Sequence, residues 1–276
     1  MEVRCHGGIS VISAFSQEVG SSAAIGLDLS VRFSLSLSPD GISREARKTL
    51  DFISAKYPGS QTPSLTIESN IPQSQGLKSS SAFTLAIVAG FLSINNIKIS
   101  ETELLQLSAQ ASLVNGTSLT GAYDDLCSSY YGGACLTNNR TMKILKRIRA
   151  PAGYLAIAYN PEKYRETRSI DTGEMKRAEE SWKPLKKLVS GGYILEAATL
   201  NGMFVGEYTG LNGDIISYFR NMGARFVSQS GKGPAIFAVF QDRKRKDDAI
   251  SQFPPSTGFK CVETTFTDEG MRVEKL

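Results

Sequence analysis

Residues 71–92, IPQSQGLKSSSAFTLAIVAGFL, join a polar segment directly to an apolar one. The first half holds a proline, a glycine and three consecutive serines, and the second half consists almost entirely of apolar residues. Serine is a modest helix former, whereas the apolar run is typical of a buried helix. The fold must therefore accommodate a helix with little polar surface, whose polar residues are gathered at its N-terminal end.

This arrangement meets the requirements for binding a phosphate group, which needs converging backbone N–H groups, small residues and a helix dipole. Gly76 permits positive φ and close approach of a ligand, and Lys78 supplies a cation. The hydroxyl groups of residues 79–81 can also ligate magnesium. The P-loop pattern G-x-x-x-x-G-K-[ST] does not occur in the sequence. Taken alone, the stretch is equally well interpreted as a serine-capped buried helix.

Two further stretches favour the phosphate-binding interpretation. TGAYDDLCSSYYGG, residues 120–133, contains adjacent acids at Asp124 and Asp125. Paired acids near a phosphate loop suit metal binding or proton acceptance from an alcohol, although an acidic helix N-terminus gives the same pattern. SQSGKGPAIFAVF, residues 228–240, places Gly231 and Gly233 in a turn between strands, where backbone could approach a ligand.

Composition narrows the function classes. The net charge of +4 over 276 residues is as compatible with a small anionic substrate as with nucleic acid. The basic run at residues 243–246 is followed at once by two aspartates, which favours a solvated helix face. No apolar stretch reaches the length of a membrane span, and the N-terminus lacks a signal-peptide core. We therefore expect a soluble cytoplasmic protein without nucleic-acid or membrane partners.

Cysteine and histidine usage argues against a zinc site of cysteine pairs and against a histidine-pair metal site. The four cysteines are scattered without the close pairs of zinc sites, so we expect buried, reduced thiols. His6 is the only histidine, which excludes a site built on a histidine pair.

Hydrophobic periodicity predicts a mixed order of strands and helices, and hence an α+β fold. We expect strands near residues 10–16, 23–38, 64–69 and 154–159, directly after the glycine pair 132–133, and near 259–267, and a strand–turn–strand unit over 225–240. Ser43 is a predicted cap for a helix over 43–57, and Ser100 and Glu103 form a predicted capping box for a helix over 100–114. Further helices are predicted over 79–92, in a short segment near 123, over 172–189, in two segments before 222, and from 243. A boundary near residue 150 divides the chain into predicted domains 1–150 and 151–276.

Taken in order, these motifs resemble the GHMP kinase superfamily, named for galactokinase, homoserine kinase, mevalonate kinase and phosphomevalonate kinase. Its second motif, P-x-x-x-G-L-G-S-S-A-A, is matched from Pro72 to Ala82, and its glycine-rich third motif by residues 230–234. Residues 7–29 resemble its first motif. Within the superfamily, GLKSSSA, TGAYDDLCSSYYGG and PEKYRETRSID are similar to the archaeal-type shikimate kinases. The resemblance implies a two-domain α+β fold with the nucleotide in the cleft between the domains.

The resemblance also implies a reaction, namely ATP- and Mg²⁺-dependent phosphorylation of the 3-hydroxyl of shikimate. Asp125, seven residues before Gly132, would be the base or orienting acceptor, with Asp124 as second candidate. Because residues 7–29 contain no lysine, Lys78 is the candidate cation beside it. The residues implied to bind ATP are Pro72, Gln75, Gly76, Leu77, Lys78, Ser79, Ser80, Ser81, Ala82, Gly231 and Gly233, with Ser80 contacting Mg²⁺.

The substrate carboxylate requires an arginine, for which Arg165 and Arg168 are candidates. Residues 110–122 contain no acid, so the second magnesium ligand found in mevalonate kinase has no counterpart there. Two alternatives remain: a GHMP kinase for another alcohol, such as homoserine or mevalonate, and a nucleotide-binding sensor without turnover. The sequence gives no prediction of the oligomeric state.

Overall fold

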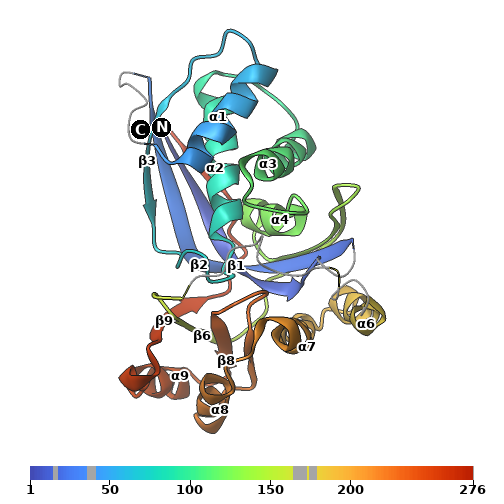
Figure 1. Ribbon diagram of the computed structural model, residues 1–276, viewed down its shortest axis with the longest axis vertical. Helices are drawn as coiled ribbons and strands as arrows, with labels where there is room; N and C mark the ends of the chain where they lie inside the picture. Colours follow the sequence, from blue (N-terminus) through green and yellow to red (C-terminus); the bar gives the residue numbers. More distant parts are fainter. Residues whose placement is uncertain (15–17, 36–41, 164–172, 174–178, 276) are drawn as a thin grey trace.

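The computed structural model describes residues 1–14, 18–35, 42–163, 173 and 179–275, and these form two antiparallel sheets with associated helices (Figure 1). The larger sheet has the order β10 (Arg272–Glu274), β1 (Glu2–Ile12), β2 (Val19–Ser34), β4 (Ala134–Asn138), β5 (Lys143–Ile148). Strand β2 pairs with β4 through its first residues and with β3 (Ser64–Ser69) through its last. The smaller sheet has the order β7 (Phe226–Gln229), β8 (Ile236–Phe240), β6 (Tyr154–Tyr159), β9 (Lys260–Thr265).

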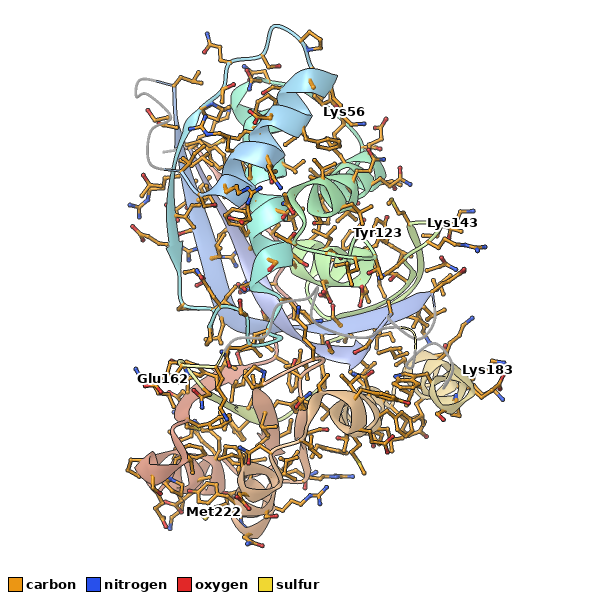
Figure 2. The ribbon with its side chains drawn as sticks, in the orientation of Figure 1. Lys56, Tyr123, Lys143, Glu162, Lys183 and Met222 are labelled. Carbon is orange, nitrogen blue, oxygen red and sulfur yellow. The ribbon has the colours of Figure 1, made fainter. Side chains whose placement is uncertain are left out.

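Helices α1 (Arg44–Lys56), α2 (Ser79–Ile94), α3 (Glu101–Asn115) and α4 (Tyr123–Tyr131) cover one face of the larger sheet, and side chains fill the space between them (Figures 1 and 2). Helices α6 (Glu179–Ser190), α7 (Ile194–Thr209), α8 (Gly213–Asn221) and α9 (Arg243–Ser251) lie in the half with the smaller sheet, together with a short 3₁₀ turn at Pro255–Thr257. Helix α7 contacts both β1 and β7 and so joins the two sheets. None of the described helices is long and apolar enough to cross a membrane.

One hydrophobic core runs through both sheets, from Val3 and Ile9 to Phe237 and Val239. A second, smaller core lies between the smaller sheet and helices α8 and α9. Helix α2 is buried over most of its length, which explains why its sequence is apolar on every side. The division into domains at residue 150 stays a prediction, since the first core extends across that position.

The predicted α+β class is confirmed, as are the Ser43 cap of α1 and the capping box of α3. The first strand begins at Glu2 rather than near Ser10, because β1 is buried on both faces and its sequence does not alternate. Strands β5 and β10 were not predicted; they are edge strands rich in exposed charged residues, without the apolar alternation of a buried strand. The helix expected over 172–189 is described from Glu179 onward.

All four cysteines are free, and Cys5, Cys127 and Cys135 are buried, as the sequence predicted. Burial raises the pKa of the Cys127 thiol well above its usual value, which keeps it protonated and unreactive.

Candidate active site

A cleft of about 500 Å³ opens at the N-terminal ends of α1, α2 and α4. It is lined mainly by small polar residues and by charged side chains of both signs. The lining consists of Ser10, Ser13, Ala14, Arg44, Glu45, Lys48, Ser74, Gly76, Lys78, Ser79, Ser80, Ser81, Asn115, Gly116, Thr117, Ser118, Thr120, Ala122, Asp124, Asp125, Gly231 and Lys232.

The N-terminal end of α2 is open toward this cleft. Lys78 is the N-cap residue in a left-handed conformation with φ of 65°, and its side chain makes no capping hydrogen bond. Its carbonyl accepts the N–H groups of Ser81 and Ala82 at 3.1 Å each. The N–H groups of Ser79 and Ser80 therefore have no intrahelical acceptor, and both residues line the cleft. Free amides at the positive end of a buried helix form a binding site for an anion.

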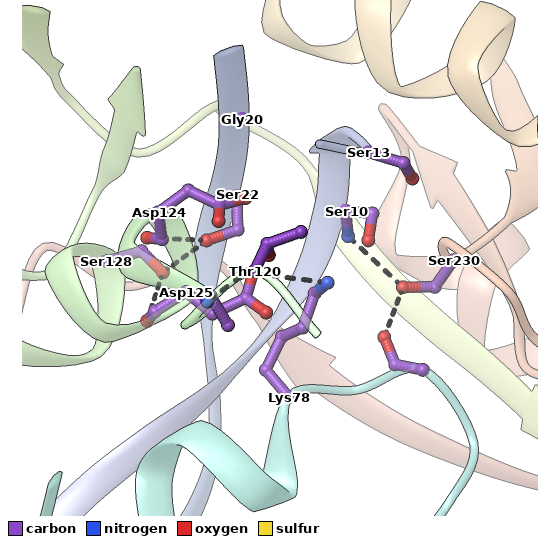
Figure 3. A network of polar contacts seen from close by, with 12 residues as sticks. Ser10, Ser13, Gly20, Ser22, Lys78, Thr120, Asp124, Asp125, Ser128 and Ser230 are labelled. Carbon is purple, nitrogen blue, oxygen red and sulfur yellow. Dashed lines mark hydrogen bonds and ion pairs between the residues drawn. The ribbon is translucent and has the colours of Figure 1, made fainter. Parts of the chain in front are cut away.

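The loop before α2 is held by the turn between β7 and β8. Gly76 has φ of 83°, and a Cβ at this position would lie 2.2 Å from the carbonyl oxygen of Ser230, so that only glycine fits. Ser230 Oγ donates to the Gly76 carbonyl at 2.8 Å and accepts the N–H of Ser10 at 3.2 Å (Figure 3). The residues that resemble the three GHMP motifs are thereby joined in one place.

Lys78 also reaches across the cleft to helix α4. Its Nζ lies 3.1 Å from Oδ1 of Asp125, and the two side chains are only 16% and 12% exposed (Figure 3). No donor in the described part of the chain makes a well-aligned hydrogen bond to that Oδ1. The ion pair therefore orients the carboxylate while leaving its lone pairs available to a ligand hydroxyl.

Asp124 is more deeply buried than its neighbour, and no cation among the described residues lies within ion-pair distance of it. Burial and the charge of Asp125 raise its pKa to about 7, against the opposing influence of Lys78 and of a 2.7 Å hydrogen bond from Asn139. A Cβ at Gly20 would lie 2.7 Å from the Asp124 carboxyl carbon, so a larger residue there would displace this carboxyl. The Asp124 carboxyl therefore keeps its proton to higher pH than an exposed aspartate does.

The structure brings eight of the residues implied by the resemblance to this cleft: Gly76, Lys78, Ser79, Ser80, Ser81, Asp124, Asp125 and Gly231. Leu77 and Ala82 point into the core instead. The Gln75 side chain donates to the carbonyls of Asn160 and Lys163.

Two further residues of that set lie outside the cleft lining. Pro72 lines a separate hollow of about 390 Å³ with Tyr159 and Pro161, and Gly233 lies against the Gln229 side chain. Arg165 and Arg168 lie outside the described residues. Direct ATP contacts by Pro72, Gln75, Leu77, Ala82 and Gly233 stay predictions.

Several residues that line the cleft were not predicted from the sequence. Ser10 and Ser13 lie at the end of β1, and Arg44 and Lys48 project from α1 into the cleft. The two basic residues are four apart and share a helix face, but the same spacing occurs on solvated helices. Asn139 belongs to no motif and carries no local signal.

The side chains that line the cleft suit a metal ion that enters already bound to the phosphates of a substrate. Among residues 1–14, 18–35, 42–163, 173 and 179–275, no three His, Cys, Asp or Glu side chains are grouped as a metal site. Mg²⁺ in kinases usually keeps several waters and binds through substrate phosphates and one or two protein oxygens. The Ser80 hydroxyl, at the open end of α2, fits that role as the protein ligand.

Comparison with known families places both halves of the chain in one family. Residues 44–133 match the GHMP kinases N terminal domain, and residues 185–258 match the GHMP kinases C terminal domain. The shikimate kinase of Thermoplasma acidophilum is 36% identical over 273 residues, which covers 99% of this chain and 97% of that protein. The shikimate kinase of Pyrococcus furiosus is 30% identical over 262 residues, covering 89% of this chain and 93% of the relative.

Solved structures share the fold at lower identity. The mevalonate kinase of Methanococcus jannaschii superimposes with a TM-score of 0.71 at 12% identity, covering 97% of this chain and 98% of that one. The homoserine kinase of Cytophaga hutchinsonii gives a TM-score of 0.69 at 18% identity, covering 98% and 96%. At these identities the likeness concerns the fold alone.

Proposed function

The chain belongs to the GHMP kinase family, and we propose that it transfers the γ-phosphoryl group of ATP to the 3-hydroxyl of shikimate, giving shikimate 3-phosphate and ADP. Two relatives named shikimate kinase are 36% and 30% identical over most of the chain. The mevalonate and homoserine kinases share its fold at only 12% and 18% identity. These comparisons favour shikimate over the other two alcohols.

The observation that carries the proposal is the ion pair between Lys78 and Asp125 beside the open end of α2. Phosphoryl transfer requires mainly the positioning of two reactants and the neutralisation of charge. An anion site with a nearby buried carboxylate provides both, because the phosphates and the attacking hydroxyl have distinct places in one cleft.

In the proposed reaction, Asp125 accepts the proton of the substrate hydroxyl while that oxygen bonds to the γ-phosphorus. The bond from the γ-phosphorus to the bridging oxygen breaks, and ADP leaves. The Lys78 ammonium orients the Asp125 carboxylate, and the N–H groups of Ser79 and Ser80 donate to phosphate oxygens. Mg²⁺ bound to ATP neutralises phosphate charge, with the Ser80 hydroxyl as its protein contact. Arg165 and Arg168 stay the candidates for the substrate carboxylate.

The test is an assay of ADP release by the purified chain with ATP, Mg²⁺ and shikimate, homoserine or mevalonate in separate reactions. We expect turnover with shikimate and formation of a phosphate monoester detectable by ³¹P NMR. Turnover with one of the other alcohols instead would identify a different GHMP kinase. Nucleotide binding without turnover on any of the three would identify a sensor. In both cases the proposal is wrong.

A further inference from the structure

Helix α4, which carries both aspartates, begins without a cap of its own. Its N-cap residue is Ala122, in a left-handed conformation with φ of 48° and ψ of 44°, and a methyl side chain accepts no hydrogen bond. The N–H groups in the first turn of a helix have no intrahelical acceptor and normally bond to an N-cap side chain. The N–H of Asp124, the second residue of α4, therefore needs an acceptor from elsewhere in the chain.

Asn139, which follows β4, supplies that acceptor. Its Oδ1 accepts the Asp124 N–H at 3.2 Å and the Thr137 hydroxyl at 2.7 Å, and its side-chain Nδ2 donates to Asp124 Oδ1 at 2.7 Å. Its own backbone N–H donates to the Glu18 carbonyl at 2.8 Å, and the residue is 3% exposed. Asn139 thus holds both the backbone and the side chain of Asp124.

These contacts fix which way the Asn139 amide points. Since Oδ1 already accepts two donors, the NH₂ group faces the Asp124 carboxyl, and an NH₂ group only donates. Asp124 Oδ1 is then the acceptor of this hydrogen bond, which favours Oδ2 as the oxygen that carries a proton when the carboxyl is protonated. The amide therefore controls the position of the proton as well as the position of the helix end.

We propose that Asn139 is a positioning residue of the active site, which caps α4 from a distant part of the chain, fixes the Asp124 carboxyl and so holds Asp125 toward Lys78. This inference rests on the proposed function in taking Asp125 as the acceptor of the hydroxyl proton. Asn139 itself lies outside the lining of the cleft and acts through Asp124.

The titratable groups that face Asp124 are Asp125 and Cys127 of α4, Lys78 before α2 and Cys135 of β4. The Asn139 hydrogen bond favours the ionised form of Asp124 and lowers its pKa. Removal of the amide therefore shifts the titration of Asp124 to higher pH, an effect that the loss of a purely structural hydrogen bond elsewhere would not produce.

The experiment compares Asn139→Ala, Asn139→Asp and the matched control Asn212→Ala in the full chain. Asn212 caps α8 in the same way, because its Oδ1 accepts a first-turn N–H, that of Ile215, at 3.1 Å. It lies outside the cleft lining. The measurements are kcat and KM for ATP and shikimate, thermal unfolding, and a ¹³C NMR titration of the aspartate carboxyls.

For Asn139→Ala we expect kcat to fall by about tenfold or more while KM for ATP changes by less than about twofold. The Asp124 titration moves to higher pH. Asn212→Ala lowers the melting temperature to a similar extent and leaves kcat unchanged. Asn139→Asp keeps the acceptor for the Asp124 N–H but sets a carboxyl oxygen against Oδ1, so its kcat stays low at pH 8 and recovers in acid, where the two carboxyls share a proton.

The inference is overturned if Asn139→Ala keeps its kcat, if Asn212→Ala loses as much, or if the Asp124 titration does not move. Should Asn139→Ala fail to fold, Asn139→Asp and Thr137→Val, which removes the donor that orients the amide, decide the matter by the same measurements. The NMR titration needs no turnover. A chain that is inactive on shikimate but shows the shift therefore refutes the proposed function and retains only the hold of Asn139 on the Asp124 carboxyl.

Discussion

Helices α3 and α2 begin in opposite ways. At the start of α3, Ser100 Oγ accepts the Glu103 N–H at 3.2 Å, and the Glu103 carboxylate accepts the Ser100 N–H at 2.8 Å. At the start of α2, Lys78 takes a left-handed conformation and offers no side-chain cap. The first end is closed by its own residues, whereas the second leaves amide donors facing the cleft.

The contrast extends to the other helices. Ser43, Asn212 and Asp242 cap α1, α8 and α9 with their own side chains. Helices α2, α4 and α7 lack such a cap, and the ion pair between Lys78 and Asp125 joins the ends of α2 and α4. The two ends differ in turn, because Asn139 caps the end of α4 from beyond β4, whereas the end of α2 keeps amide groups open to the cleft, as an anion site requires.

Asp125→Asn, which removes the carboxylate between the ends of α2 and α4, is expected to have the largest effect on activity. An amide cannot accept the hydroxyl proton as a carboxylate does, so we expect kcat to fall by roughly 10²- to 10⁴-fold. Steady-state kinetics with shikimate measure this, and the melting temperature serves as the control for folding. A variant with near-normal kcat would remove Asp125 from the mechanism.

Lys78→Met keeps much of the side-chain length but removes the ammonium from the buried pair. Loss of a charged contact of this kind costs about 1.5–3 kcal/mol, or roughly 10- to 100-fold in rate if it is felt in the transition state. We expect this loss to appear in kcat. The control is Lys56→Met, the same substitution at a lysine in the last turn of α1 that does not line the cleft. An equal loss in both variants would contradict a specific role for Lys78.

The buried acid at the start of α4 makes stability depend on pH. The pKa of Asp124 rises from 3.8 to about 7 on folding, so the folded chain binds more protons than the unfolded chain between these values. Stability contributed by the protonated form is therefore lost as pH rises through this window. Relative to the native chain, Asp124→Asn should gain on the order of a few kcal/mol between pH 4 and pH 8. A pH-independent difference in unfolding free energy between the two proteins would contradict the assignment.

The smallest effect is expected at the closed end. Ser100→Ala removes one half of the capping box of α3 and should lower the unfolding free energy by about 1 kcal/mol. Because no residue of the first turn of α3 lines the cleft, kcat should not change. Chemical denaturation measures the loss, and reduced activity in this variant would mean that capped and uncapped ends are not functionally distinct.

The sequence by itself determined the features that depend on neighbours within a few residues. The caps of α1 and α3, the burial of α2 and the α+β class follow from local hydrogen bonds and from hydrophobic periodicity, both of which are written in consecutive residues. The order of the motifs also predicted a phosphate loop and a role for Asp125; the structure brings Gly76, Lys78 and Asp125 to one cleft, and their roles stay predictions.

Only the tertiary structure decided how these parts act together. Ser230 bonds to Gly76 across a sequence separation of 154 residues, Asn139 caps Asp124 across 15, and Lys78 meets Asp125 only because the ends of α2 and α4 converge. No local pattern encodes such contacts, since each depends on strand pairing and on core packing between distant segments. The end of α4, which has no cap of its own, is held by Asn139, a partner that no pattern in consecutive residues indicates.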